Sequence, residues 1–149
     1  MIRPGPYRHC AATRFMLTLN KPLARHCLLV AHGSRLEASN AEIRVLAALL
    51  DSLSTEFSQI ECAFLEIAKP SIPDGLRHLI AQGAQNIVVV PYFLSAGRHV
   101  MTDIPEQVAG VQSQFPAIDI RITAYIGANK GMAELVLAHV LSSPEQLSV

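Results

Sequence analysis

The sequence lacks the features that mark several common classes of protein. It contains no tryptophan, only 5% aromatic and 16% charged residues, and its acidic and basic side chains balance to a net charge of zero. Balanced charge gives no field that would attract nucleic acid, and scarce aromatic residues offer no platform for stacking bases. No apolar run reaches the ~18 residues of a membrane-spanning helix. We therefore expect neither nucleic acid nor a membrane as a partner.

Cysteine is also scarce. The three cysteines, Cys10, Cys27 and Cys62, show no CxxC or zinc-ligand spacing. Such scattered cysteines are typical of apolar packing residues in a reducing compartment, so we expect a cytoplasmic protein. Apolar residues are abundant, and half of the 149 residues are hydrophobic. That content excludes a disordered chain and is enough for one domain with its own core.

Composition divides the chain into three regions. Residues 1–24 hold two early prolines and four basic residues, and we expect a disordered extension there, or a true initiator at Met16. Residues 25–143 carry the regular apolar pattern of a folded domain. Residues 144–149 are expected to form a tail.

Strands and helices are predicted to alternate through the domain. Continuous apolar runs predict strands at 26–31, 60–67 and 86–94, and an alternating run predicts a fourth at 118–126. Strands that are apolar on both faces are typical of a parallel sheet flanked by helices. We therefore expect an α/β fold with a doubly wound, four-stranded parallel sheet, in the order 2-1-3-4.

The predicted helices differ in how clearly their starts are marked. An apolar stripe at positions 43, 46, 50 and 53 predicts the first helix. The second and third are expected to begin at the capping boxes Ser71-Ile-Pro-Asp74 and Asp103-Ile-Pro-Glu106, each with proline in the first turn. A final short helix is predicted over 132–141.

Polar residues follow three of the predicted strands. His32 comes after the first strand, Glu66 after the second and His99 after the third. In such sheets ligands bind beyond the carboxyl ends of the strands, where the order 2-1-3-4 lets the two imidazoles face each other. Two histidines and a carboxylate suit Fe²⁺, Co²⁺, Ni²⁺ or Zn²⁺, and imidazole also accepts protons near neutral pH. We predict these three residues to be both metal-binding and catalytic.

Basic and small polar residues flank the same three positions. Cationic side chains can hold carboxylates or phosphates, although each can also form an ordinary surface salt bridge. Glu66 likewise has an alternative role, as a partner of a nearby lysine or as a cap for the following helix. We expect four flanking residues to bind an anionic substrate: Ser34, Arg35, Lys69 and Arg98.

Three segments resemble the small sirohydrochlorin chelatases of the CbiX/SirB family. They are LLVAHGSR at 28–35, AFLEIAKPSI at 63–72 and VVVPYFLSAGRHVMTDIPEQV at 88–108, and the resemblance covers roughly 26–140. It implies a class II chelatase fold, with this chain equivalent to half of a two-domain member. It also implies a lyase that inserts Co²⁺ or Fe²⁺, or Ni²⁺ in some relatives, into a tetrapyrrole on the route to cobalamin or sirohaem.

The resemblance also implies roles for particular residues. His32 and His99 match the two histidines that face the metal in the family, and Glu66 matches its acidic residue. The metal is then a substrate and not a permanently bound cofactor. Two copies of this single half are expected to form a homodimer that assembles the cleft for the tetrapyrrole.

The residues alone leave other functions open. A carrier that binds a divalent metal or a tetrapyrrole without catalysis could use the same side chains. An α/β interaction module would use none of them. A histidine phosphatase would need an arginine directly before His32, where the sequence has Ala31. The residue types accept several metals, so the metal and the pathway stay open.

Overall fold

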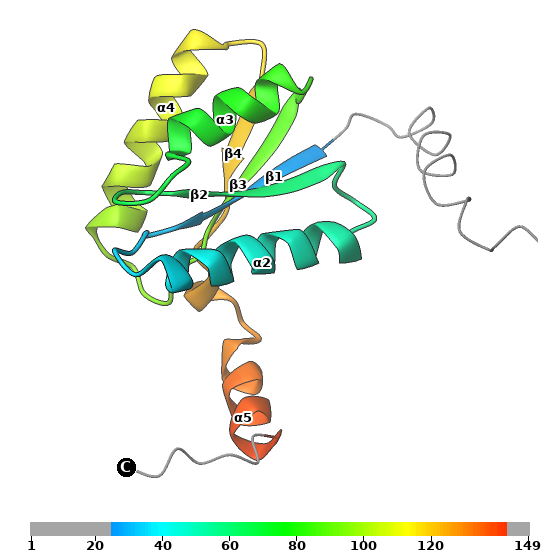
Figure 1. The fold of residues 1–149 in the computed structure, drawn as a ribbon, viewed down its shortest axis with the longest axis vertical. Coiled ribbons are helices and arrows are strands. Elements are labelled where there is room, and N and C mark those ends of the chain that lie inside the picture. The colour runs from blue at the N-terminus through cyan, green and yellow to red at the C-terminus, as the bar shows by residue number, and fades with distance from the viewer. Residues whose placement is uncertain (1–24, 143–149) are drawn as a thin grey trace, which may run out of the picture.

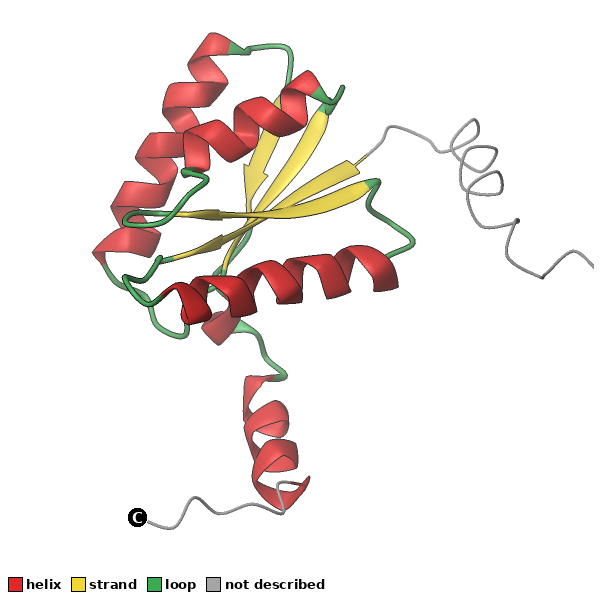
Figure 2. Ribbon diagram, viewed as in Figure 1, coloured by secondary structure: helices red, strands yellow, loops and turns green. Residues whose placement is uncertain are grey.

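The computed structural model describes residues 25–142, which form a parallel sheet with helices packed against both faces (Figures 1 and 2). The strands are β1 Arg25–Ala31, β2 Gln59–Phe64, β3 Asn86–Pro91 and β4 Asp119–Ile122. The helices are α2 Glu37–Leu53, α3 Ile72–Ala81, α4 Ile104–Gln114 and α5 Met132–Ser142, with a π-helical turn η2 His99–Asp103 and a 3-10 turn η3 Ile126–Ala128. The expectations for residues 1–24 and 144–149 lie outside the described residues.

The strand order β2-β1-β3-β4 confirms the doubly wound sheet. β1 lies at the centre and pairs in parallel with both β2 and β3, and its residues from His26 to Ala31 are all buried. β4 ends at Ile122, four residues earlier than predicted. Its last pair is Ile122 with Val89, and the ladder stops there because Pro91 has no N–H to donate to the next pair.

The main core lies between the sheet and the helices α3 and α4. Alternate residues of β1 and β3, such as Leu28 and Ile87, contribute to it from the sheet. From α3, Ile72, Leu76 and Leu79 contribute to this core, and all three are fully buried. Packing of α3 and α4 on this face of the sheet therefore helps to fix the position of the loops at its carboxyl edge.

Ser71 caps α3 as the sequence predicts. Its hydroxyl oxygen accepts a hydrogen bond from the Asp74 backbone N–H at 3.3 Å, and Pro73 lies in the first turn. The same hydroxyl is the largest of the influences that hold the pKa of the Asp74 carboxyl below its ordinary value. The cap fixes where the chain leaves the loop after β2 and enters the helix.

Replacing this cap gives a simple test of the fold. Ser71→Ala removes an acceptor at the helix N-terminus and should lower the free energy of unfolding by about 1 kcal/mol. Urea unfolding followed by circular dichroism measures the change. Ser113→Ala removes an exposed hydroxyl that bonds to Gly110 O within α4, and it serves as the control. Equal, negligible effects of both substitutions would contradict the cap.

The capping box predicted at Asp103 is wrong. The chain is already helical from His99, because η2 runs without a break into α4, and Asp103 has helical dihedral angles of φ −67° and ψ −42°. A residue inside a helix cannot adopt the extended conformation of an N-cap. The Asp103 carboxylate instead turns toward His99, where it forms part of the site described below.

The buried side of α2 also differs from the prediction. The residues buried there are Asn40 and Ala47, whereas Leu50 is 37% and Leu53 71% exposed. Asn40 sets the rotation of the helix, because its side-chain amide bonds to both the backbone N–H and the carbonyl of Ser34. The residues of the predicted stripe therefore lie on a partly exposed side of α2. We call this side the α2 flank; it carries Ile43, Leu46, Leu50 and Leu53.

The last helix, α5, forms where the sequence predicts it, one residue longer. It leads away from the sheet and its helices (Figure 1). None of the helices in residues 25–142 has the length and hydropathy that crossing a membrane requires.

Candidate metal-binding site

The structure brings His32, Glu66 and His99 together at the carboxyl edge of the sheet. Each side chain offers one ligand atom, and these atoms all lie within 4.8 Å of one another. The two imidazole rings meet edge to face, with centroids 4.9 Å apart and an interplanar angle of 69°. The cluster forms because β1 lies between β2 and β3, so that the loops after all three strands end side by side.

Hydrogen bonds orient both imidazoles in the same way. Nδ1 of His32 lies 2.9 Å from the carbonyl oxygen of Gly33, and Nδ1 of His99 lies 2.7 Å from Oδ2 of Asp103. Because a carbonyl or carboxylate oxygen accepts, each Nδ1 is the donor, and in a neutral imidazole Nε2 then keeps the lone pair that a metal needs. A second partner that holds the far nitrogen in this way is the usual arrangement around a metal-binding histidine.

The contact between His32 and Glu66 has a length that suits a shared cation. Nε2 of His32 lies 3.0 Å from Oε1 of Glu66. A proton or a metal ion between these two atoms would bind to both. Ligand bonds of about 2.0–2.2 Å place neighbouring ligand atoms about 3 Å apart, which matches this contact. His32 and Glu66 are about half exposed, so an ion can reach them from solvent.

The loop after β1 and the loop after β2 pack closely against each other at the site. Gly33 has φ +96°, and a Cβ built on it would lie 2.0 Å from the carbonyl oxygen of Glu66. The Glu66 backbone N–H donates to the carbonyl of His32 at 3.0 Å. The absence of a side chain at Gly33 therefore lets the backbone that carries His32 pack directly on the backbone that carries Glu66.

Backbone strain is concentrated beside Glu66. Ile67 has φ +68°, a value that a β-branched side chain rarely adopts, and Ala68 N–H donates back to Glu66 O at 2.7 Å in the same tight turn. This turn also ends β2 three residues earlier than predicted. Strain of this kind is typical of functional loops, where the surrounding structure enforces it.

The four flanking residues predicted to bind substrate lie in the loops after β1, β2 and β3. Arg98 and Lys69 are strongly exposed, with long contacts of 3.5 Å to Asp103 and 3.7 Å to Asp74. Arg35 is exposed just before α2. The Ser34 hydroxyl oxygen accepts from the Leu36 backbone N–H at 3.0 Å, so it shapes the turn into α2.

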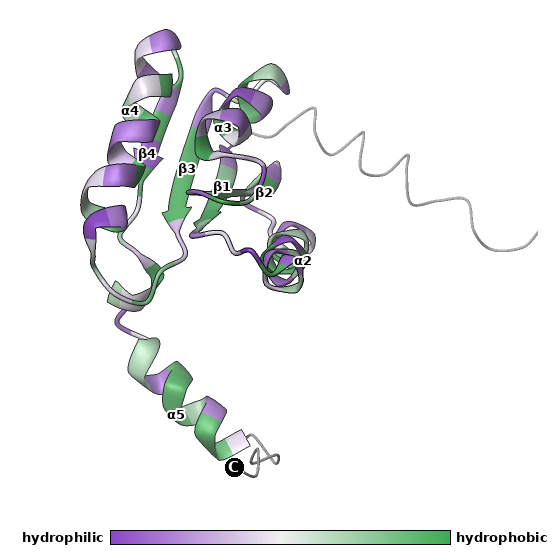
Figure 3. Cartoon of the chain, turned by 60° about the vertical axis from the view of Figure 1, so that its left-hand side comes forward, coloured by the Kyte–Doolittle hydropathy of each residue, from purple (hydrophilic) through white to green (hydrophobic). Residues whose placement is uncertain are grey.

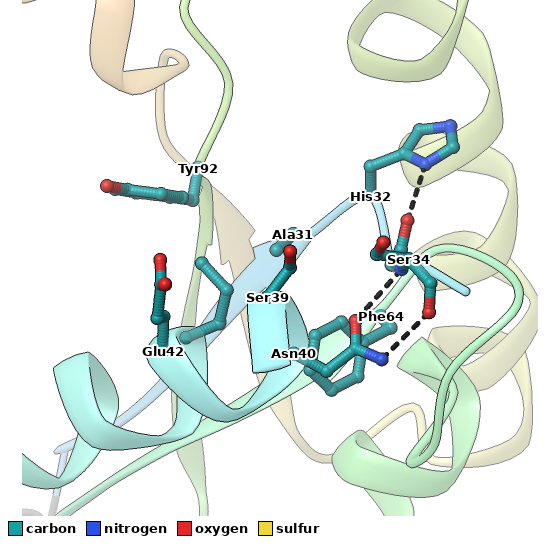
Figure 4. Close-up of a pocket in the computed structure, with 10 residues that line it drawn as sticks. Ala31, His32, Ser34, Ser39, Asn40, Glu42, Phe64 and Tyr92 are labelled. Carbon is teal, nitrogen blue, oxygen red and sulfur yellow. Dashed lines mark hydrogen bonds between the residues drawn. The ribbon is translucent and has the colours of Figure 1, made fainter. Parts of the chain in front are cut away.

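An open hollow of about 300 Å³ lies between α2 and the loop that follows β1 (Figure 4). Its walls include Ser34, Asn40, Ile43 and Tyr92. Figure 4 shows that the His32 imidazole points away from Tyr92 and Glu42. His32 lines this hollow, whereas Glu66 and His99 do not, so the cluster lies at its border; on its other side the hollow is lined by Ile43 of the α2 flank.

The cysteines with described positions take no part in the cluster. Cys27 is buried in β1, and burial raises the pKa of its thiol to about 11. Burial is also the largest cause that raises the pKa of the Cys62 thiol. Both therefore remain thiols at neutral pH, as the prediction of packing residues requires.

Sequence reasoning missed one residue of the site, Asp103. Its position before Pro105 suggested a helix cap, whereas its spacing of four residues from His99 was the signal that places both on one helical face. Asp103 holds the Nδ1 proton of His99, so we describe it as a positioning residue.

Asp103→Asn tests this role. An asparagine amide can donate to Nδ1 and leave the proton on Nε2, which removes the lone pair that a metal needs. We expect the affinity for Co²⁺ to fall about 10–100-fold, with the fold unchanged. A Co²⁺ titration followed by visible absorption measures this. Asp119→Asn, at the start of β4 where Asp119 pairs with Arg121, should leave affinity unchanged. Unaltered affinity in the Asp103 variant would contradict the positioning role.

Comparison with known proteins agrees with this fold. The SirB sirohydrochlorin chelatase from Bacillus subtilis subspecies spizizenii, solved in complex with cobalt, superposes with a TM-score of 0.73 and is 29% identical, over 80% of this chain and 50% of that one. The structure is therefore that of a class II chelatase fold. The family model for CbiX matches residues 26–143, and the chain belongs to the CbiX family.

Two curated relatives show how the chain compares in length. It is 36% identical to the chloroplastic sirohydrochlorin ferrochelatase of Arabidopsis thaliana, over 79% of this chain and 53% of the relative. It is 32% identical to a sirohydrochlorin cobaltochelatase of Saccharolobus islandicus, over 76% of this chain and 91% of the relative. The chain therefore spans about half the length of one kind of relative and nearly all of another.

Proposed function

We propose that this protein is a lyase that inserts Co²⁺ or Fe²⁺ into sirohydrochlorin. The observation that carries the proposal is the cluster of His32, Glu66 and His99 at the carboxyl edge of the sheet. The names of the relatives, which include a ferrochelatase and a cobaltochelatase, support the substrate and both metals. In this proposal the metal is a substrate that passes through the site, and no resident cofactor is needed.

The chemistry assigns a task to each of the three side chains. Insertion exchanges two pyrrole N–H protons for one divalent ion. Nε2 of His32 and of His99 would bind the ion and replace part of its hydration shell. When the ion leaves for the macrocycle, the same lone pairs can accept the protons that it displaces. Glu66, 3.0 Å from His32, would share the metal or take a proton from that imidazole.

The surroundings of the cluster suit a large anionic ring. Sirohydrochlorin carries eight carboxylates, and Arg35, Arg98, Lys69 and the Ser34 hydroxyl are proposed to bind some of them. Exposed apolar side chains adjoin the ligands along the chain and would contact the faces of the ring: Ile67, Leu94 and Met101. A site open on one side leaves room for such a ring beside the metal.

The proposal includes a homodimer in the cytoplasm. Support for the dimer comes from the exposure of the site, because the side chains of His32, Glu66 and His99 are each about half exposed beside a single α/β unit. A second copy would supply the other wall of the cleft. Support for the compartment comes from Cys27 and Cys62, both of which are free thiols.

An anaerobic insertion assay tests the function. Purified protein is mixed with sirohydrochlorin and with Co²⁺, Fe²⁺ or Ni²⁺ in turn, and the absorption spectrum of the macrocycle reports the product. We expect turnover with Co²⁺ or Fe²⁺ well above the rate without protein. Tight retention of the tetrapyrrole without turnover would indicate a carrier, and absence of binding to any of these metals would refute the assignment.

A further inference from the structure

We propose that Asn40 is a positioning residue for metal binding, which keeps the proton of His32 on Nδ1 by holding the peptide bond between Gly33 and Ser34. Two further side chains of α2 keep the Asn40 amide in place and connect it to the loop after β2. The inference rests on the proposed function, because that function assigns Nε2 of His32 to the metal. It concerns a side chain that lies outside the cluster of candidate ligands.

Asn40 is a polar side chain in a buried position. It is 3% exposed and lies near the start of α2. Its amide oxygen accepts a hydrogen bond from the Ser34 N–H at 2.9 Å, and its nitrogen donates to the Ser34 carbonyl at 2.8 Å. Figure 3 shows hydrophobic strands β1 and β3 and a more hydrophilic connection from β1 to α2, which is the segment that Asn40 holds. Because a lost bond would leave a buried amide unpaired, these two contacts fix Ser34 firmly.

The peptide bond between Gly33 and Ser34 connects Asn40 to His32. The Ser34 N–H and the Gly33 carbonyl belong to one planar unit, and they point in opposite directions because this peptide is trans. Asn40 accepts from its N–H at 2.9 Å, and Nδ1 of His32 lies 2.9 Å from its carbonyl oxygen. Figure 4 shows the two contacts in series. The orientation of the imidazole therefore depends on a peptide plane that Asn40 holds.

This relay favours the form of His32 that a metal needs. The Gly33 carbonyl can only accept, so a neutral His32 in this contact carries its proton on Nδ1 and a lone pair on Nε2. A hydrogen bond to one side of a peptide also polarises the unit and strengthens the bond on the other side. Without the acceptor on Asn40, the peptide plane is free to turn and the contact that selects the tautomer weakens.

Glu37 determines which way the Asn40 amide points. Its Oε2 accepts from the Asn40 nitrogen at 3.1 Å, while the second N–H of that nitrogen donates to Ser34 O. The bond from Asn40 is the largest of the influences that hold the pKa of the Glu37 carboxyl below its ordinary value. Glu37 therefore remains an acceptor at neutral pH, and the amide oxygen of Asn40 remains turned toward the Ser34 N–H.

Arg44 extends these contacts to the loop after β2. Its guanidinium donates to Oε1 of Glu37 and, from the other terminal nitrogen, to Lys69 O at 3.1 Å. The same group lies over the Phe64 ring, 5.3 Å from the centroid, which restricts it further. Lys69 follows Glu66 by three residues in one loop. One set of hydrogen bonds therefore connects the loop after β1 with the loop after β2.

Two substitutions of Asn40 separate the relay from a purely structural role. Asn40→Asp keeps an oxygen that can accept from the Ser34 N–H but loses both donated bonds, whereas Asn40→Leu has nearly the same shape and loses all three contacts. Nitrogen-15 NMR shifts of the neutral His32 imidazole in metal-free protein report which nitrogen carries the proton, and His32→Ala assigns the signals. We expect the Nδ1–H form in the unsubstituted protein and in Asn40→Asp, and a mixture with the Nε2–H form in Asn40→Leu.

Cobalt binding is the second readout. In a Co²⁺ titration followed by visible absorption, affinity should fall about 10-fold in Asn40→Leu and much less in Asn40→Asp. Ser39→Asp adds the same charge one residue earlier and measures the electrostatic effect of the new carboxylate. A structural role predicts instead that both Asn40 variants lose affinity together, because both lose the donated bonds. Equal losses, or an unchanged tautomer and affinity in folded Asn40→Leu, would overturn the proposal.

Arg44 provides a test on a more exposed residue, which applies even if the substitutions of buried Asn40 unfold the protein. Arg44→Lys keeps the charge but replaces the planar group that bonds to two partners from different nitrogens. We expect Co²⁺ affinity to fall roughly 2–5-fold, and the KM for the metal to rise with the KM for sirohydrochlorin unchanged. Arg77→Lys is the matched control, because Arg77 is similarly exposed, 44% against 40%, and bonds to Gln114 on another part of the surface. Identical results for the two lysine variants would contradict the network.

The tautomer measurement requires no metal, so it separates this inference from the proposed function. If the unsubstituted protein bound no divalent metal, the chelatase assignment would fail, and the NMR shifts would still decide whether Asn40 controls His32. If folded Asn40→Leu inserted metal at the full rate, the chelatase assignment would stand and the relay would be refuted.

Discussion

His32→Ala and His99→Ala should each lower the rate of metal insertion about 100-fold or more, which is the scale for loss of a positioned acid–base group. Both residues follow strands at an open edge, and neither belongs to the buried core, so thermal unfolding should change little. Each variant loses an Nε2 lone pair that we assign to metal binding.

His78→Ala is the matched control. His78 lies in α3 and is half exposed like the two candidate ligands, but it contacts Glu61 at 3.4 Å on a different part of the surface. It should keep full activity. Folded His32 and His99 variants with normal insertion rates would show that the metal binds elsewhere. If only one of them lost activity, the other would be a tetrapyrrole contact, and Glu66 would be the next ligand to replace.

The positions of these residues could be predicted because the strands are continuous apolar runs. Such runs identify the parallel sheet, and in a parallel sheet the residues after each strand share one edge. The order β2-β1-β3-β4 then brings the loops with His32, Glu66 and His99 together. Local patterns also predicted the Ser71 cap, since that contact depends only on neighbouring residues.

Features that depend on tertiary contacts were harder to predict. A capping-box pattern looks the same whether its first residue precedes a helix or ends a π-helical turn, so the pattern at Asp103 predicted a cap and not a contact with His99. Helical periodicity showed that α2 is amphipathic but not which neighbour its apolar side meets. The Asn40 bonds to Ser34 set the rotation of the helix, and the α2 flank then stays partly exposed instead of entering the core.

Gly33→Ala should disable the site almost as fully as loss of a ligand. The new Cβ would lie 2.0 Å from Glu66 O, and because that atom is backbone, the whole turn that carries Glu66 must move. The bond from Glu66 N–H to His32 O would stretch or break with it. A positive φ costs an alanine about 1–2 kcal/mol, and the overlap adds roughly 1–3 kcal/mol.

Gly83→Ala separates these two costs. Gly83 has φ +94°, nearly that of Gly33, but a Cβ there would meet nothing within 4 Å. It should therefore lower the free energy of unfolding by the backbone cost alone and leave Co²⁺ affinity and insertion unchanged. Gly33→Ala should lose both stability and, by about 100-fold, metal affinity, because a ligand moved by about 1 Å no longer meets its partners. Equal behaviour of the two variants would show that close packing of the two loops does not hold the site together.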